Sequence, residues 1–131
     1  MGSRWGVLPL RIVVGLVFAV HGAQKLFGFG LAGTAGFLGS VGIPLPTVAA
    51  AALIAVELLG GLALLLGAGT RIAAAALAAD MLVAILTLHV RGGFFVPDGI
   101  EFVLTVFGAC LALVGLGAGP CSVDGARGRA S

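Results

Sequence analysis

Seven ionisable residues lie inside or at the ends of apolar stretches of this chain, where a charge is costly. They are Arg11, His21, Lys25, Glu57, Asp80, His89 and Glu101. In such surroundings, acids and bases can hold or transfer a proton, or hydrogen-bond the polar end of a ligand. A second interpretation stays open for Arg11, Glu57 and Asp80, because a buried salt bridge can fix helix packing without doing chemistry. For His89 the simpler interpretation is a side chain that reaches water at a helix end.

Other chemistry finds little support in the sequence. There is no nucleophile elbow, no phosphate-binding loop and no Cys/His cluster with the spacing of metal ligands, so no metal site is predicted. No disulfide is predicted, because Cys110 falls within the last apolar segment and Cys121 falls beyond it. The net charge of +2 is too small to indicate a nucleic-acid partner.

The composition indicates a helical protein of the membrane. Of the 131 residues, 60% are hydrophobic and 9% are charged, whereas soluble domains have about 25% charged residues. A small soluble domain buries only about two-thirds of its chain surface, so the remaining apolar surface requires lipid as its solvent. We therefore predict an all-α integral membrane four-helix bundle. Residues 1–131 form a single domain in this prediction, because the length leaves no room for a second.

Four segments are apolar for about the 20 residues that a membrane span needs. They lie near residues 7–27, 46–67, 70–90 and 99–118. The glycine-rich segment 28–45 is too interrupted to span, and we expect it to lie at the membrane interface. The tail from Gly119 onward is polar and basic, and we expect it to be mobile.

The basic residues predict how the spans are oriented. Five of them fall on the side of the chain termini, namely Arg4, Arg11, Arg71, Arg127 and Arg129. Lys25 and Arg91 fall toward the other side. Because Lys and Arg favour the cytoplasmic side, both termini are predicted to be cytoplasmic in a bacterial plasma membrane.

Helical periodicity predicts which residues share a face, since each residue turns the helix by about 100°. On the first span one sector holds Arg11, Phe18, His21, Gly22 and Lys25. Each of the other three spans has an acid on one face. Glu57 shares its face with Ala50, Leu53, Gly61 and Leu64, and Asp80 shares its face with Ala73, Ala76, Ala84 and Thr87. Glu101 shares its face with Thr105, Gly108, Ala112 and Gly115. These faces predict an inward polar column in which small residues allow close packing of the third and fourth spans.

The depth of each residue follows from a rise of about 1.5 Å per residue. Glu57 and Asp80 come out near the middle of the membrane, and Arg11 lies toward the cytoplasmic end. Lys25, His89 and Glu101 lie nearer the opposite end, and His21 lies between them and the middle. Arg11 and His21 are the predicted partners of Glu57.

In these residues the chain resembles the DoxX family of four-span bacterial membrane proteins. The resemblance rests on RIVVGLVFAVHGAQKLF at 11–27, on GFLGSVGIPLP before the second span, and on ELLGGLALLLGAGTR at 57–71. Asp80, His89 and Glu101 follow in order, and the ending GLGAGPCSVD is similar to the closing pattern of the family. The family has an aromatic residue more often at the position of Cys121.

The resemblance implies a membrane subunit that serves redox chemistry. Some members are linked to a complex that passes electrons from thiosulfate to quinone, and others to oxidoreductase complexes that act against oxidative stress. A quinone is thus a candidate cofactor, held without a covalent bond. The bilayer, soluble or membrane oxidoreductase subunits and further copies of the chain are the candidate partners. Whether the chain is itself an enzyme stays open.

Two other functions stay open. One is a small proton-coupled transporter, like the short four-helix multidrug exporters, although those carry their key acid in the first helix, where this chain has Arg11, His21 and Lys25. The other is a structural membrane anchor for soluble oxidoreductases, for which the polar residues would be dispensable.

Overall fold

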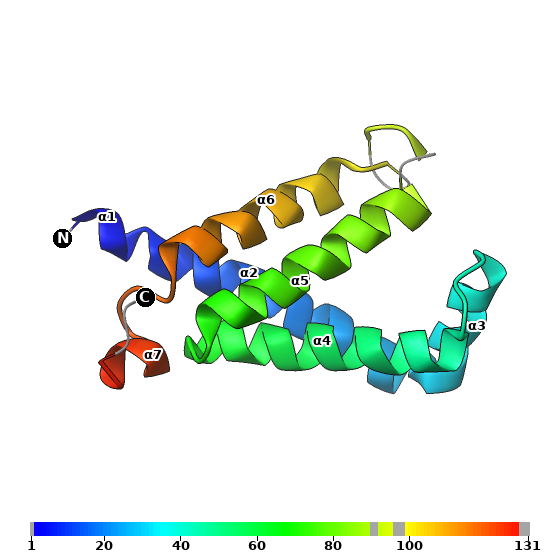
Figure 1. The fold of residues 1–131 in the computed structure, drawn as a ribbon, viewed down its shortest axis with the longest axis horizontal. Helices are drawn as coiled ribbons and strands as arrows, with labels where there is room; N and C mark the ends of the chain where they lie inside the picture. The colour runs from blue at the N-terminus through cyan, green and yellow to red at the C-terminus, as the bar shows by residue number, and fades with distance from the viewer. Residues whose placement is uncertain (1, 90–91, 96–98, 129–131) are drawn as a thin grey trace.

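The computed structural model describes residues 2–89, 92–95 and 99–128, and for Gly2, Ser3, Leu88 and His89 it describes the backbone alone. Within these ranges the chain is helical and contains no strand. Four long helices form an elongated bundle (Figure 1). They are α2 (Val7–Ala23), α4 (Pro46–Leu66), α5 (Thr70–Ala84) and α6 (Glu101–Leu116).

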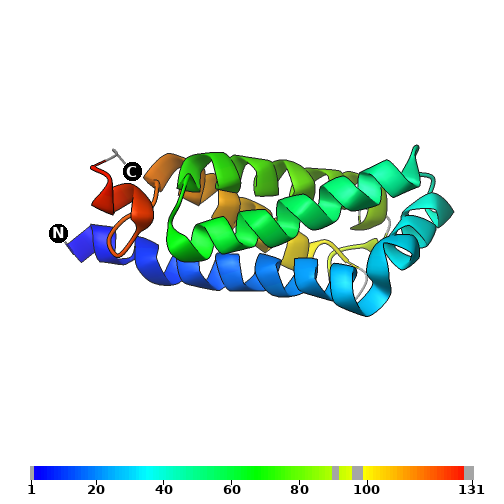
Figure 2. The same cartoon turned by 90° about the horizontal axis from the view of Figure 1, so that it is seen from below.

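Shorter elements extend and join the long helices. They are α1 (Gly2–Trp5), α3 (Gly30–Ser40), α7 (Val123–Ala126) and two π-helical segments, Gln24–Phe29 after α2 and Ile85–His89 after α5. Both termini lie at one end of the bundle, which we call the terminal end, and α3 lies at the other, the distal end (Figures 1 and 2). The prediction that both chain ends share a side agrees with this arrangement, whereas which side of a membrane they face stays a prediction.

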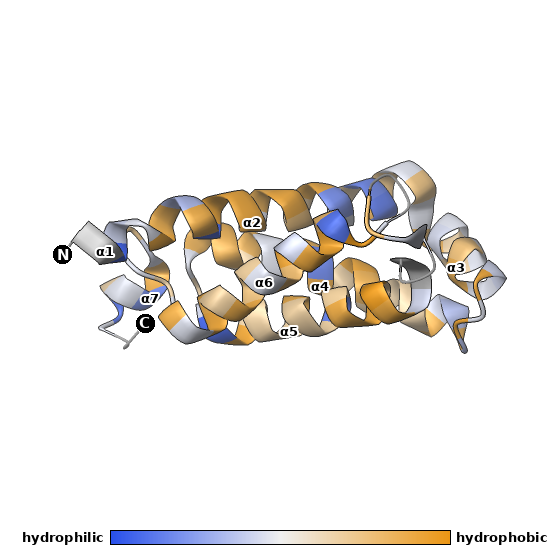
Figure 3. Cartoon of the chain, turned by 90° about the horizontal axis from the view of Figure 1, so that it is seen from above, coloured by the Kyte–Doolittle hydropathy of each residue, from blue (hydrophilic) through white to orange (hydrophobic). Residues whose placement is uncertain are grey.

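Among the residues that the structure describes, three helical stretches are long and apolar enough to cross a bilayer: Val7–Ser40, Pro46–Leu66 and Thr70–Thr87. The fourth predicted span corresponds to α6, which is apolar but shorter. Apolar residues run along all four long helices (Figure 3). The all-helical prediction is confirmed, and the helices are those of a membrane protein by length and composition.

Proline and glycine set the boundaries of α4. Pro46 occupies the first turn, where the missing N–H costs nothing. Gly67 ends the helix in the left-handed region at φ 69°, and Gly69 precedes α5 at φ 58°. Because only glycine adopts these angles without strain, the two glycines allow a very short turn between α4 and α5.

Glycine also lets α2 and α4 approach closely. A methyl group at Gly22 would lie 2.8 Å from Cα of Leu58, and one at Gly15 would lie 2.9 Å from the carbonyl oxygen of Gly61. Either methyl would push the two backbones apart. The predicted inward face of Glu57 is confirmed in this packing, since Gly61 is buried together with Ala50 and Leu64.

The predicted inward face of the fourth span is wrong. Gly108 and Thr105 are exposed, and no atom lies within 4 Å of where a methyl group on Gly108 would be. The buried face of α6 holds Val103, Val106, Cys110 and Leu113. These larger apolar side chains fill the space against α5, so the small residues point outward.

The segment 28–45 forms α3 and the connection to α4. Ala35 and Leu38 of α3 pack against Ala50 of α4, so this segment belongs to the bundle's packing. Its position at a membrane interface stays a prediction.

The expectation of a mobile tail is wrong for its described part, residues 119–128. This stretch folds back over the terminal end of the bundle and includes α7. Asp124 is 6% exposed there. The tail is held because its polar groups meet backbone donors and acceptors of three other segments, as set out below.

Candidate functional site

A cavity of about 550 Å³ lies in the distal half of the bundle. Its walls are mostly apolar side chains from α2, α3, α4, α5 and α6 and from the connection before α4. Polar side chains enter it at five positions: His21, Lys25, Glu57, Asp80 and Thr87. Ligand sites have this character in general, with apolar walls and a few placed polar groups.

Lys25 and Glu57 form an ion pair inside this cavity. Lys25 Nζ donates to Glu57 Oε1 at 2.7 Å, and the two side chains are 23% and 5% exposed. The expectation that Arg11 and His21 are the partners of Glu57 is therefore wrong. Helical counting correctly placed Lys25 on the inward sector of the first span, but it put Lys25 nearer the distal end than Glu57, so this pair was not predicted.

Asp80 completes a group of three charges, which we call the charged triad: Lys25, Glu57 and Asp80. The Asp80 carboxyl lies within side-chain hydrogen-bonding reach of Glu57 and is also close to Lys25. Its Oδ2 atom is buried and has no hydrogen-bond partner within the described part of the chain. One ammonium group cannot neutralise two carboxylates, so the triad needs one proton or one more donor.

His21 lies at the edge of the cavity. Its ring stacks on Phe102 of α6 with 6.3 Å between ring centroids, and Nδ1 lies 2.7 Å from the carbonyl oxygen of Val17. If Nδ1 carries the proton of a neutral ring, Nε2 is an acceptor. Thr87 donates its hydroxyl proton to Val83 O at 2.6 Å.

Glu101 is not among the described residues that line the cavity. Glu101 is half-buried at the start of α6, where its carbonyl oxygen accepts from the Thr105 hydroxyl. The prediction for the His89 side chain falls outside what the structure describes.

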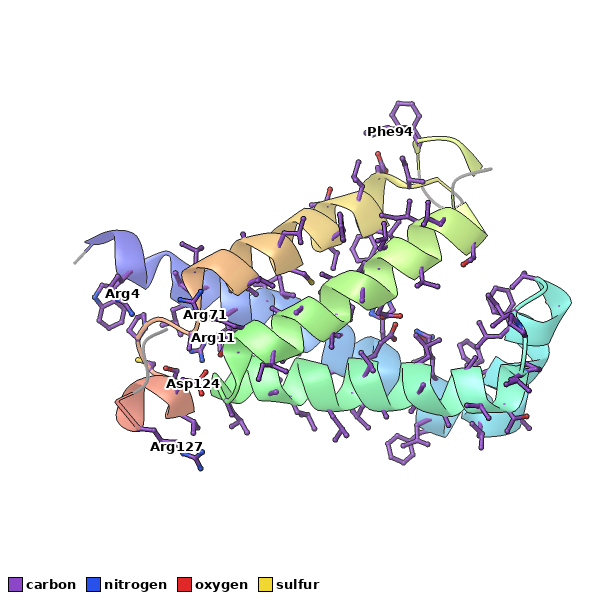
Figure 4. All side chains as sticks on the ribbon, viewed as in Figure 1. Arg4, Arg11, Arg71, Phe94, Asp124 and Arg127 are labelled. Carbon is purple, nitrogen blue, oxygen red and sulfur yellow. The ribbon has the colours of Figure 1, made fainter. Side chains whose placement is uncertain are left out.

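Arg11 belongs to a second polar group, which lies at the terminal end of the bundle (Figure 4). Its side chain is fully buried, and Nη2 donates to the carbonyl oxygens of Cys121 at 2.8 Å and Pro120 at 3.3 Å. The continuous polar column predicted from the sequence is therefore wrong. Gly67 makes this arrangement possible, because a side chain there would overlap the guanidinium group.

Asp124 joins the tail to the start of α5. Its two carboxylate oxygens accept from the backbone N–H groups of Gly69 at 2.8 Å and Thr70 at 2.9 Å. A carboxylate suits this place, since the first N–H groups of a helix lack partners within the helix. The backbone of Asp124 also donates to Gly67 O at 2.9 Å.

The sequence reasoning missed Asp124 as a structural residue. The pattern that could have indicated it is Ser122 followed by Asp124, just beyond the glycine-rich end of the last span, because Ser and Asp often cap helices. Ser122 indeed caps α7 by accepting from the N–H of Gly125.

Comparison with known proteins gives a consistent result. The sequence model of the DoxX family matches residues 6–90, which hold Arg11 and the whole charged triad. This chain belongs to the DoxX family. The match extends from α2 through α5, whereas α6 and the Asp124 tail lie beyond it.

Two similar proteins cover most of this DoxX chain. One is a Bacillus subtilis (strain 168) protein named "Putative oxidoreductase CatD", 36% identical over 110 residues, or 84% of this chain and 79% of that protein. The other, from Haemophilus influenzae, is named "Uncharacterized protein" and is 39% identical over 119 residues, or 88% of this chain and 85% of that protein. No solved structure matches.

Among the described residues of this DoxX protein, no group of three or more His, Cys, Asp and Glu side chains is placed to hold a metal ion. The charged triad is instead suited to hydrogen bonding and to holding a proton. An ammonium group donates three hydrogen bonds, and a protonated carboxyl donates one. The site can therefore offer donors to a ligand with two carbonyl-type acceptors.

Proposed function

We propose that this DoxX protein is a four-span subunit of a redox complex in the bacterial plasma membrane and that its cavity binds the headgroup of a quinone. The observation that carries the proposal is the charged triad at the base of a mostly apolar cavity. Weaker support for a redox role comes from the name of one relative, which contains the word "oxidoreductase".

The residues present fit a quinone. The headgroup is apolar on its faces and bears two carbonyl oxygens, which need donors at separate points. Lys25 can supply one donor, and Asp80 in its protonated form can supply another through the oxygen that has no protein partner. The volume of about 550 Å³ lies within the range of small-molecule sites.

A bound quinone would supply electron acceptance coupled to proton uptake. The residues of this chain would orient its headgroup and hold a proton close to it. Glu57 holds Lys25 in place through their ion pair, which leaves the Asp80 carboxyl, whose Oδ2 is buried without a partner among the described residues, as the group that would hold the proton. The apolar walls, including Phe18 and Val103, would contact the faces of the ring.

The electrons would come from a partner subunit. The two cysteines of this sequence are fewer than the four thiolates that an iron–sulfur cluster usually takes. A soluble or membrane oxidoreductase bound to the bundle is therefore part of the proposal, as is a cytoplasmic position of both termini.

Binding of a short-chain quinone to the purified protein in detergent tests this function. We expect Asp80→Leu, which removes the donor at similar size, to weaken binding at least tenfold, which equals about 1.4 kcal/mol. Leu59→Ala is the matched control, because Leu59 is 64% exposed and does not line the cavity. Equal affinity in Asp80→Leu and in the unaltered protein would contradict the quinone site and favour a structural anchor.

A further inference from the structure

We infer that water and ligands reach the charged triad from the distal half of the bundle, and that the terminal end is sealed. This inference rests on the proposed ligand site and membrane placement, and it adds the side from which the site is reached. Three observations carry it: where the cavity ends, what lies beyond it, and how the tail closes the terminal end.

The cavity stops well short of the terminal end. Its lining residues nearest that end are Val17 on α2, Glu57 on α4, Ala76 on α5 and Val106 on α6. Each of them lies at least six residues from the terminal end of its helix. At about 1.5 Å per residue, at least about 9 Å of bundle separates the cavity from that end.

Packed apolar side chains fill this part of the bundle. Val14, Leu64, Leu77, Cys110 and Leu113 all belong to one core cluster, and none is more than 6% exposed. Protein cores of this kind are as dense as organic crystals and leave no continuous path for water. The charged triad and Arg11 are thus separated by an apolar seal.

The tail adds a second barrier at the terminal end. Arg11 binds the carbonyl groups of Pro120 and Cys121, and Asp124 binds the first turn of α5. These contacts tie α2, the α4–α5 turn and α7 together (Figure 4). The tail thus occupies Arg11 Nη2 and the first N–H groups of α5, whereas Arg11 Nε and Nη1 are buried without a partner among the described residues.

The cavity opens outward within the distal half of the bundle. Thr87 and Phe102 line it toward the distal end and are exposed, and Ala76, its lining residue nearest the terminal end on α5, is exposed at the side of the bundle. Helices α4 and α5 diverge from their short turn toward the distal end (Figure 1). The Lys25–Glu57 ion pair in this cleft attracts water into it, because unsolvated charges are costly.

Two native cysteines make the inference testable by thiol labelling. Cys121 is exposed and marks the terminal side, whereas Cys110 is fully buried and is labelled only if the bundle unfolds. Single cysteines would be added at Ala76, inside the cavity, and at Thr87, at its distal edge. Ala75→Cys is the matched control, because Ala75 is an exposed neighbour on α5 that does not line the cavity.

A charged, membrane-impermeant methanethiosulfonate would be applied to sealed membrane vesicles of both orientations, and the labelled residues identified by mass spectrometry. We expect Ala76→Cys and Thr87→Cys to react only in the orientation in which Cys121 is protected. We expect Ala76→Cys to react at least tenfold faster than Ala75→Cys.

Reaction of Ala76→Cys from the Cys121 side would overturn the inference, as would equal rates at positions 75 and 76. A folded Ala76→Cys protein that reacts from neither side would also overturn it. If the Ala76→Cys protein unfolds, so that Cys110 is labelled, the Thr87→Cys protein is used instead. Its reaction from the Cys121 side would overturn the inference, and its reaction from the opposite side alone would support it. Adding a short-chain quinone tests the proposed function separately. If the quinone does not slow the labelling, the proposed quinone site is contradicted, but the inferred access route is unaffected.

Discussion

The ammonium group of Lys25 lies 2.7 Å from the carboxylate of Glu57 and joins the π-helical end of α2 to the middle of α4. The pair is held at one side by Thr34, whose buried hydroxyl donates to the carbonyl oxygen of Lys25 at 3.3 Å. On its other side lies Asp80 of α5. The Lys25–Glu57 ion pair therefore holds two helices together and is also part of the candidate site.

Removing Lys25 should cost more stability than neutralising Glu57. In Lys25→Met the Glu57 carboxylate stays buried without its partner, and we expect a loss of about 2 kcal/mol, below the 3–5 kcal/mol of fully buried pairs because Lys25 is partly exposed. Thermal unfolding in detergent measures this loss. The double variant Lys25→Met/Glu57→Gln should recover part of it, and strictly additive losses would contradict a coupled pair.

Glu57→Gln should leave a folded protein with reduced function. The amide has nearly the shape of the carboxyl but cannot take up the charge that positions Lys25. Complementation of a deletion strain under thiosulfate or peroxide stress measures function, with protein level and thermal stability followed in parallel. Normal complementation by a stable Glu57→Gln protein would favour the structural anchor.

Gly22→Leu should disrupt the bundle, whereas Gly108→Leu should not. A side chain at Gly22 would meet the backbone of Leu58, but a side chain at Gly108 meets open space. Size-exclusion profiles and unfolding temperatures of the two variants in detergent make the comparison. Loss of folding or assembly in Gly108→Leu would show that the outer face of α6 packs against another helix.

Asp124→Asn should loosen the tail. Loss of the carboxylate weakens two hydrogen bonds to the start of α5, and lost helix caps cost about 1 kcal/mol. Limited proteolysis between Gly117 and Gly128 should become faster. Arg127→Ala is the control, because Arg127 is exposed at the end of α7, and equal cleavage rates in the two variants would contradict a role for Asp124 in holding the tail.

The C-terminus should be cytoplasmic. A reporter that is active only in the cytoplasm should give a signal when fused after the last residue, and a periplasmic reporter should stay silent. The reason is the excess of Lys and Arg on the terminal side. The opposite pattern of reporter activity would reverse the orientation, while leaving the arrangement of the helices unchanged.

The sequence by itself determined the helices and the identity of the acids. Long apolar segments cannot be anything but helices in lipid, since every backbone group needs a partner, and Pro46 and Gly67 set the limits of α4. The inward face of Glu57 also followed from helical periodicity, because a charged side chain is held away from lipid. The predicted face of Asp80 did not, since Ala76 and Thr87 are exposed and α5 buries Ala74, Leu77, Ala78 and Met81 instead.

Only the tertiary structure decided which residues meet. Helical counting put Lys25 on the inward sector of the first span, but only the packing of α2 against α4 decided that its ammonium group meets Glu57 at 2.7 Å. Helical counting could not anticipate that α6 buries its larger residues and turns Gly108 outward, because both of its faces are apolar enough to pack. Arg11 and Asp124 lie over a hundred residues apart in the chain, and their common cluster depends on a fold-back that no local pattern encodes.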